Sequence, residues 1–151
     1  MATPQLKLTY FDAAGRAELT RLALAFGNIP FDAVAALRVD MIVETLVDLT
    51  TAFATAFFAE RDEVLRAEKT KVFAGETVPK TLGTLESMVQ GEFFGGDSIS
   101  LADLHLFDLV TNGLGIYSPG FTTAPFPKLE AVMENVKANT NIAAYLAKSN
   151  P

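Results

Sequence analysis

The residues that could do chemistry in this chain are few, and their types exclude several kinds of catalysis. The chain has no cysteine, so a thiolate nucleophile, a disulfide framework and a Cys-ligated metal are excluded. His105 is the one imidazole, and it lies four residues after Leu101 on a strongly apolar segment. A zinc centre or a catalytic triad is therefore nearly excluded. We interpret His105 as a core histidine with its hydrogen bonds satisfied rather than as an acid or base.

Two aspartates, Asp97 and Asp103, are spaced so that they could be mistaken for paired catalytic carboxylates. Ser100, however, precedes an apolar run and has Asp103 three residues later, which is the spacing of a helix-capping box. The capping role accounts for Asp103. The stretch Gly95-Gly96-Asp97 lacks the strand and helix context of a phosphate-binding loop, so it is predicted to be a turn.

Four phenylalanines form the apolar candidate for a binding function: Phe53, Phe57, Phe58 and Phe73. They could line a pocket for apolar ligands. Packing in the core or at an interface is the alternative, and the sequence leaves both open.

The first third of the chain predicts a strand, a helix and a second strand. Gln5 to Thr9 is short, rich in β-formers and followed by a turn-prone segment, which indicates a strand. Arg16 to Phe26 has apolar residues at steps of three and four, and Gly27 stands where a helix cap is expected. Ile29 to Phe31 could form the second strand, parallel to the first.

The rest of the chain predicts helices, so the fold class is mainly α. A long helix over 33–59 is indicated by one apolar stripe: Val34, Leu37, Met41, Ile42, Leu46, Leu49, Phe53 and Phe57. Two further helices are predicted at 63–73 and 79–90, with a kink or break at 75–78. A helix over 101–115 is apolar almost all round and should be the most buried, and helices at 128–138 and 142–148 follow.

The bulk composition limits the partners. Of the 151 residues half are apolar, which suits a globular protein, and the net charge is −6 with only 12 Lys and Arg. Such a surface is not built to neutralise phosphates, so nucleic acid is not expected as a partner. The N-terminus shows no leader pattern and no uncharged apolar window reaches bilayer length, so we expect a cytoplasmic protein with no membrane partner.

Four segments carry a resemblance to a known family. They are Leu8 to Asp12 with Gly15-Arg16-Ala17-Glu18 and Thr20-Arg21-Leu22, then Leu37 to Leu46, Gly96 to Asp103 and Phe126 to Leu129. In this order the chain resembles a cytosolic glutathione transferase of the sigma class. The resemblance implies an all-helical glutathione-transferase C-terminal domain at 34–151, preceded by a truncated thioredoxin-like β-α-β fragment at 1–33.

The resemblance also implies a site. Tyr10 would be the catalytic tyrosine, Arg16 would orient it, and Tyr10 and Phe11 would contact glutathione, which is a substrate; no metal is implied. A free thiol has a pKa of about 8.5, so a hydroxyl aimed at the sulfur favours the reactive thiolate. The second substrate would be a small apolar electrophile, and the activity would be one of detoxification.

The chain departs from the family after Ile29 to Asp32. The family continues with a helix, a strand entered through a cis-proline, and a Gln-Ser pair that opens another helix and holds the γ-glutamyl carboxylate. Here, residues 33–37 instead join the second strand almost directly to the long helix. Because remote contacts position the reacting atom, we expect weak or absent conjugation.

Two interpretations follow, and both predict a homodimer. In the first, the chain is an enzyme whose site is rebuilt in the dimer, with the strand edge at Lys7 to Thr9 pairing between subunits. In the second, the chain is a non-catalytic helical dimer that binds apolar ligands or partners.

Overall fold

The computed structural model describes residues 33–118 and 120–149, and this part of the chain is helical. The predicted strands and the helix of residues 1–32 lie outside the described residues. The helices are α2 Ala33–Ala54, α3 Glu63–Val72, α4 Val78–Met88, α5 Leu101–Asp108, α6 Gly115–Tyr117, α7 Pro127–Ala138 and α8 Thr140–Ser149. Three π-helical turns, Thr55–Ala59, Phe73–Thr77 and Leu109–Leu114, connect some of them. The prediction of a mainly α fold is confirmed.

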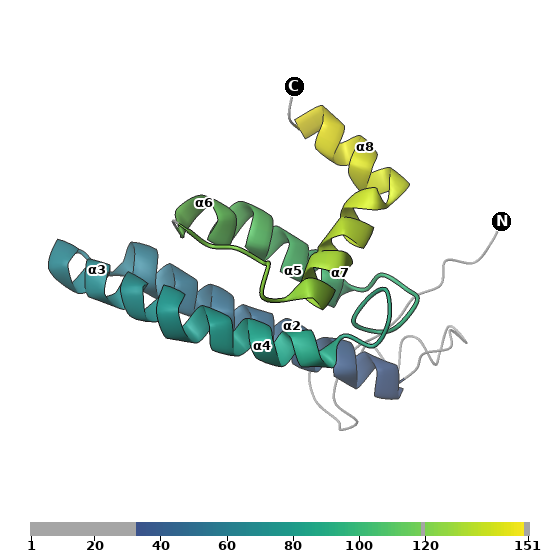
Figure 1. The fold of residues 1–151 in the computed structure, drawn as a ribbon, viewed down its shortest axis with the longest axis horizontal. Helices are drawn as coiled ribbons and strands as arrows, with labels where there is room; N and C mark the ends of the chain where they lie inside the picture. The colour runs from purple at the N-terminus through teal and green to yellow at the C-terminus, as the bar shows by residue number, and fades with distance from the viewer. Residues whose placement is uncertain (1–32, 119, 150–151) are drawn as a thin grey trace, which may run out of the picture.

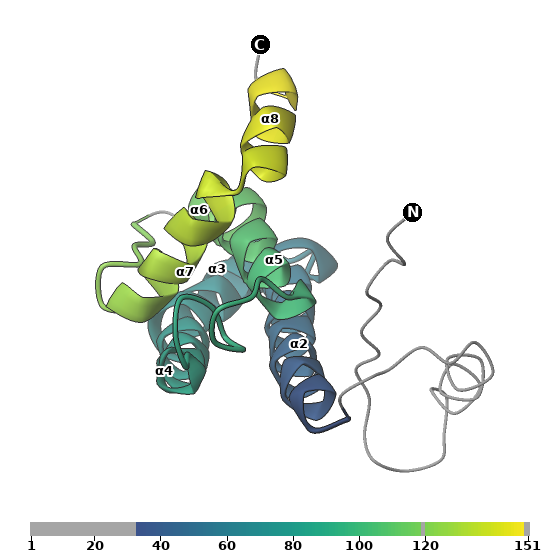
Figure 2. The same ribbon diagram turned by 90° about the vertical axis from the view of Figure 1, so that its right-hand side faces the viewer.

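Four of these helices surround the core. α2 runs the length of the molecule, and the chain returns antiparallel to it through α3 and α4 (Figure 1). α5 packs on α2, α7 packs on both α5 and α4, and α4 packs on α2, which closes the arrangement. α8 contacts α7 and extends away from this body (Figure 2).

The core stripe of α2 follows the predicted periodicity with one correction. Ile42, Leu46, Leu49 and Phe53 are buried, at alternating steps of four and three residues that keep them on one face of the helix. Met41 was predicted to lie in this stripe but is 49% exposed. It precedes Ile42 by one residue, and a step of one residue turns the side chain about 100° around the helix, away from the core.

The segment Ala36–Ala59 is long and apolar enough to cross a membrane by length and composition, and no other helix in the described residues is. A core helix of a soluble protein passes the same test. Its buried residues lie on one side, where α4 and α5 pack, and the exposed residues Glu44 and Asp48 interrupt the other side. One-sided packing of this kind is typical of a helix at the edge of a helical bundle.

The predicted interruption between α3 and α4 is a change of hydrogen bonding rather than a break. Pro79 has no N–H, and its ring would clash with the carbonyl of Gly75 in a regular α-helix. The chain forms a π-helical turn there instead, and the N–H of Val78 donates to the carbonyl of Phe73, five residues back. The helical path therefore continues from α3 into α4.

α3 has no buried residue, in contrast to α2, α4, α5 and α7. Asp62 caps its N-terminus, accepting hydrogen bonds from the N–H groups of Val64 at 2.9 Å and Leu65 at 3.0 Å. Its tertiary contacts are made with the π-helical turns at either side. α3 is thus held by its cap and by its two neighbours in the chain.

The helix predicted at 101–115 is formed by α5, the π-helical turn Leu109–Leu114 and α6 together. Ala102, Leu106 and Leu109 are buried as expected. Of residues 101–115, 7 are buried, a larger share than in any other helix of the described residues, so the prediction that this helix is the most buried is confirmed. Its apolar surface is nevertheless not covered all round, because Leu101 is 63% exposed and Leu104 is also exposed. α5 packs on α2 and α7, and these two side chains line an open hollow beside α2.

α7 and α8 match the predicted helices to within two residues. Pro127 occupies the first turn of α7, where its missing N–H costs nothing. The first free N–H groups of α7 are satisfied from another helix, because the carboxylate of Glu86 in α4 accepts from Lys128 N and Leu129 N, both at 2.9 Å. This contact joins the end of α4 to the start of α7.

Candidate functional site

The three residues predicted to handle glutathione, Tyr10, Phe11 and Arg16, lie outside the described residues. Their roles stay predictions. The described residues form the helical part of the candidate site, and two hollows there are large enough for a small molecule.

The first hollow, which we call the α2–α5 pocket, has a volume of about 630 Å³. It lies between the first turns of α2 and the loop that leads into α5. Two of the segments that carry the family resemblance therefore meet at this pocket. Its lining residues are Val39, Asp40, Val43, Gly95, Ser98, Ile99, Ser100, Leu101 and Leu104.

Asp103 holds the rim of this pocket in place. Its fully buried carboxylate accepts from Ser100 N at 2.7 Å, from Ser100 Oγ at 2.6 Å and from Phe94 N at 2.8 Å. The predicted capping box is present. The bond to Phe94 was not predicted, because the sequence spacing of nine residues gives no sign that the loop folds back onto the helix start.

The turn predicted at Gly95 to Asp97 is present. Phe93 N donates to Gly96 O at 2.9 Å, and Gly96 has a φ of +100°, a conformation that glycine adopts without strain. Asp97 is exposed in this loop whereas Asp103 is buried. Their different environments agree with a capping role for Asp103 and not with a pair of catalytic acids.

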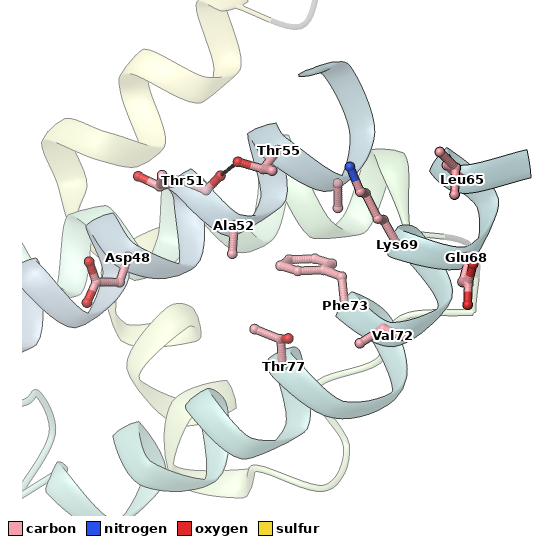
Figure 3. Close-up of a pocket in the computed structure, with 11 residues that line it drawn as sticks. Asp48, Thr51, Ala52, Thr55, Leu65, Glu68, Lys69, Val72, Phe73 and Thr77 are labelled. Atoms are coloured by element: carbon pink, nitrogen blue, oxygen red, sulfur yellow. Dashed lines mark hydrogen bonds between the residues drawn. The ribbon is translucent and has the colours of Figure 1, made fainter. Parts of the chain in front are cut away.

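The second hollow, the α2–α3 groove, has a volume of about 780 Å³. It lies between the C-terminal half of α2 and the segment from α3 to the start of α4 (Figure 3). Its apolar lining residues are Ala52, Ala56, Leu65, Val72 and Phe73, and its polar ones are Asp48, Thr51, Thr55, Glu68, Lys69 and Thr77.

The four phenylalanines that the sequence singled out serve mainly to pack against one another. Phe53 is central, with ring centroids 4.8 Å from Phe57, 5.6 Å from Phe58 and 6.0 Å from Phe73. Tyr117, which the sequence did not indicate, joins the cluster at 5.4 Å from Phe58. Such tilted and edge-on pairs are the preferred aromatic geometry. Phe73 also lines the α2–α3 groove, so this one residue both packs in the core and lines a hollow.

His105 is half-buried rather than fully buried, and it lines a small hollow of about 170 Å³ with Phe53 and Asp108 among others. Asp108 accepts from Asn112 Nδ2 at 2.7 Å, and no hydrogen bond of the imidazole is present within the described residues. The predicted hydrogen-bonded core histidine is thus not found. Among the described residues, no three His, Asp or Glu side chains lie close enough together to hold a metal ion.

The described residues form an all-helical domain with two hollows of ligand size. A family model described as "Glutathione S-transferase, C-terminal domain" matches residues 47–149, about two thirds of the chain. The chain therefore belongs to the glutathione S-transferase family, of which it carries the C-terminal helical domain. The sequence matches no curated protein.

Solved structures share the fold. Rat hPGDS complexed with a quinoline is 20% identical with a TM-score of 0.67, over 94% of this chain and 96% of that one. A glutathione transferase homologue from Sulfitobacter, with bound glutathione, is 23% identical with a TM-score of 0.68, over 91% and 68%. Prostaglandin synthase D of Nilaparvata lugens is 19% identical with a TM-score of 0.65, over 96% and 98%. At these identities the likeness establishes the fold alone.

Proposed function

We propose that this protein conjugates the thiolate of glutathione to small apolar electrophiles, slowly, with Tyr10 as the hydroxyl donor to the sulfur. The observation that carries the proposal is the α2–α5 pocket, because it is apolar, of ligand size and formed at the start of α2. Five apolar side chains line it: Val39, Val43, Ile99, Leu101 and Leu104.

The connectivity of the chain supports this assignment. α2 begins at Ala33, and Val39 follows six residues later, which corresponds to about 9 Å along a helix. Residues 1–32 are therefore attached close to the pocket, and Tyr10 belongs to them. The Sulfitobacter homologue was solved with bound glutathione, which supports glutathione as the thiol substrate.

We further propose that residues 1–33 form a truncated thioredoxin-like β-α-β fragment of the sigma-class type and that 34–151 form the helical domain. Arg16 then orients Tyr10, and Phe11 contacts glutathione. Because the chain passes directly from residue 32 into α2, few further contacts to the tripeptide are available, and conjugation is slow. The protein acts in the cytoplasm as a homodimer, without a metal.

The test measures conjugation of glutathione to 1-chloro-2,4-dinitrobenzene by the chain and by the Tyr10→Phe variant. The rate above background should fall about tenfold or more in the variant, because the thiolate loses its donor. Tyr117→Phe is the matched control, since it removes a hydroxyl from the distant aromatic cluster and should leave the rate unchanged. Equal rates for the chain and for Tyr10→Phe would contradict the proposal.

A non-catalytic helical dimer that binds apolar ligands is the second candidate, and the α2–α3 groove favours it. Isothermal titration separates the two. Heat on adding glutathione that disappears in Tyr10→Phe supports the enzyme, whereas no heat at millimolar glutathione supports the ligand-binding protein.

A further inference from the structure

We propose that the α2–α3 groove binds a small protonated amine that carries an aromatic or branched apolar body. The inference goes beyond the proposed function, because it involves neither Tyr10 nor the α2–α5 pocket. It rests on the shape of the groove, on the direction of its hydrogen bonds and on its charge.

The walls of the groove suit an apolar body of limited size. A volume of about 780 Å³ is in the range of small-molecule sites. Phe73 lies between the two sides of the groove, opposite Ala52, and forms its buried apolar floor (Figure 3). Leu65 and Val72 each leave about half of their surface exposed, at 48% and 47%. Covering this surface with an apolar ligand would be favourable.

The hydroxyl groups on the α2 side of the groove can accept further hydrogen bonds but cannot donate them. Thr51 Oγ1 already donates to Val47 O at 2.9 Å, and Thr55 Oγ1 donates to Thr51 O at 2.8 Å. Each hydroxyl has one hydrogen, so only its oxygen lone pairs remain available. This wall therefore selects a ligand that brings donors.

The charge of the groove has the same preference. Its one cation, Lys69, is held by Glu60, with Nζ 2.7 Å from Oε2. Asp48 and Glu68 also line the groove, and neither has a hydrogen bond or an ion pair within the described residues. In Figure 3, Asp48 lies at the far end of the groove from Lys69.

An ammonium group satisfies both preferences, because it brings up to three donors and a positive charge to acceptor oxygens and unpaired carboxylates. A carboxylate or phosphate ligand would face the unpaired carboxylates of Asp48 and Glu68, and the one cation in the lining, Lys69, is already paired with Glu60. Of a positive, a neutral and a negative ligand, the positive one therefore fits the groove best.

The experiment compares three probes with the same apolar body: 4-phenylbutylamine, 4-phenylbutan-1-ol and 4-phenylbutyrate. Isothermal titration at pH 7 and low ionic strength should give the tightest binding for the amine. We expect it to bind about threefold or more tightly than the alcohol, and the acid to bind more weakly than both. The advantage of the amine should shrink as salt is added.

Variants assign the effect to the groove. Asp48→Asn should bring the affinity of the amine close to that of the alcohol and leave the alcohol unchanged. Asp97→Asn is the matched control, since it removes the same charge from the loop before α5. Ala52→Leu should weaken all three probes by filling the groove, with circular dichroism reporting whether the variant folds. If Ala52→Leu does not fold, Val72→Ala takes its place, because Val72 lies at an exposed position and its truncation does not disturb the core. It should also weaken all three probes.

The outcomes separate clearly. Equal affinity for amine and alcohol, tighter binding of the acid, or no binding of any probe at millimolar concentration would each overturn the proposal. An amine preference that survives Asp48→Asn would also overturn it. Tyr10→Phe should bind the amine as the unmodified chain does, so failure of the conjugation assay and failure of this inference are distinguishable.

Discussion

At the scale of single residues, Asp103 is the one charged residue that is buried within the described part of the chain. It is fully buried and accepts three hydrogen bonds, two from Ser100 and one from Phe94 N. Phe94 is itself fully buried. One side chain thus starts α5, fixes the preceding loop and shapes the rim of the α2–α5 pocket.

Replacement of Asp103 should therefore lower the free energy of unfolding, and by more the fewer acceptor oxygens the new residue keeps. Asp103→Ala leaves buried donors without partners and should lower the free energy of unfolding by about 2–3 kcal/mol. Asp103→Asn keeps one acceptor oxygen and should cost less. Urea denaturation of both variants, beside exposed Asp97→Asn, measures the order. Equal stability of Asp103→Ala and the unmodified chain would show that Phe94 N and Ser100 find other partners.

The contacts of Glu60 lower the pKa of its carboxyl group. Its pKa lies below the ordinary 4.5, first because Lys69 donates a hydrogen bond to it and then because the N–H of Asp62 does. The folded pKa is lower than the unfolded one, so this carboxylate stabilises the fold at neutral pH. The contribution starts to fall as the pH drops below the unfolded pKa, and it is lost as the pH falls through the folded one.

A pH series tests this sign. The unmodified chain should melt slightly higher than Glu60→Gln at pH 7, and the difference should shrink below pH 4.5 and disappear as the pH falls through the lowered folded pKa of Glu60. Thermal unfolding at several pH values gives the comparison. A difference that stays constant over this range would mean that the contact with Lys69 does not depend on the charge of Glu60.

At the scale of helices, hydrogen bonds at the helix ends fix how neighbouring helices pack. α7 has no side-chain cap of its own at Phe126, and Glu86 from α4 supplies it instead. A carboxylate at a helix N-terminus also interacts favourably with the helix dipole. This one contact both starts α7 and fixes it against α4.

Glu86→Ala should lower the free energy of unfolding by about 1–2 kcal/mol, since two N–H groups lose their acceptor. Glu86→Gln retains one acceptor and should lose about half as much. Guanidinium denaturation followed by circular dichroism provides the values. Glu130→Gln, which removes an exposed charge from the same turn of α7, is the control, and a loss as large there would refute the specific role of Glu86.

The sequence predicts these helices better than it predicts their contacts. Periodicity places α2, α7 and α8, and it also places most core residues of α2, because a repeat near 3.6 requires a buried face. Pro79 signals a disturbance, but that it becomes a π-helical turn depends on the carbonyl of Phe73 being free to accept from Val78. The pairing of Glu86 with α7 joins residues 42 and 43 positions apart, and no local pattern shows such a contact.

At the scale of the whole molecule, the helical half of the candidate site was predictable and its hollows were not. Motifs identified the family and placed Ser100 and Asp103 correctly. The α2–α3 groove depends on how α3 lies against α2, and α3 has no buried residue that could have marked its position. The sequence identifies Phe73 as a candidate pocket or core residue, but it does not show which residues Phe73 contacts.

The assembly prediction also belongs to this scale. We expect a homodimer, with a sedimenting mass twice the 16.2 kDa of the chain at micromolar concentration. Most soluble oligomers of one chain type are twofold dimers, and the strand edge at Lys7 to Thr9 would supply the pairing surface. A single species of 16.2 kDa in sedimentation equilibrium would contradict the prediction.

The absence of buried residues in α3 has a consequence for the molecule in motion. An element with few packed contacts separates from the rest at a lower free energy than the core does, so its amides should exchange with solvent sooner than those of α7. α3 is also one wall of the α2–α3 groove. A molecule held there would shift the opening equilibrium, so slower deuterium uptake confined to α3 would report occupancy without any change in the overall fold.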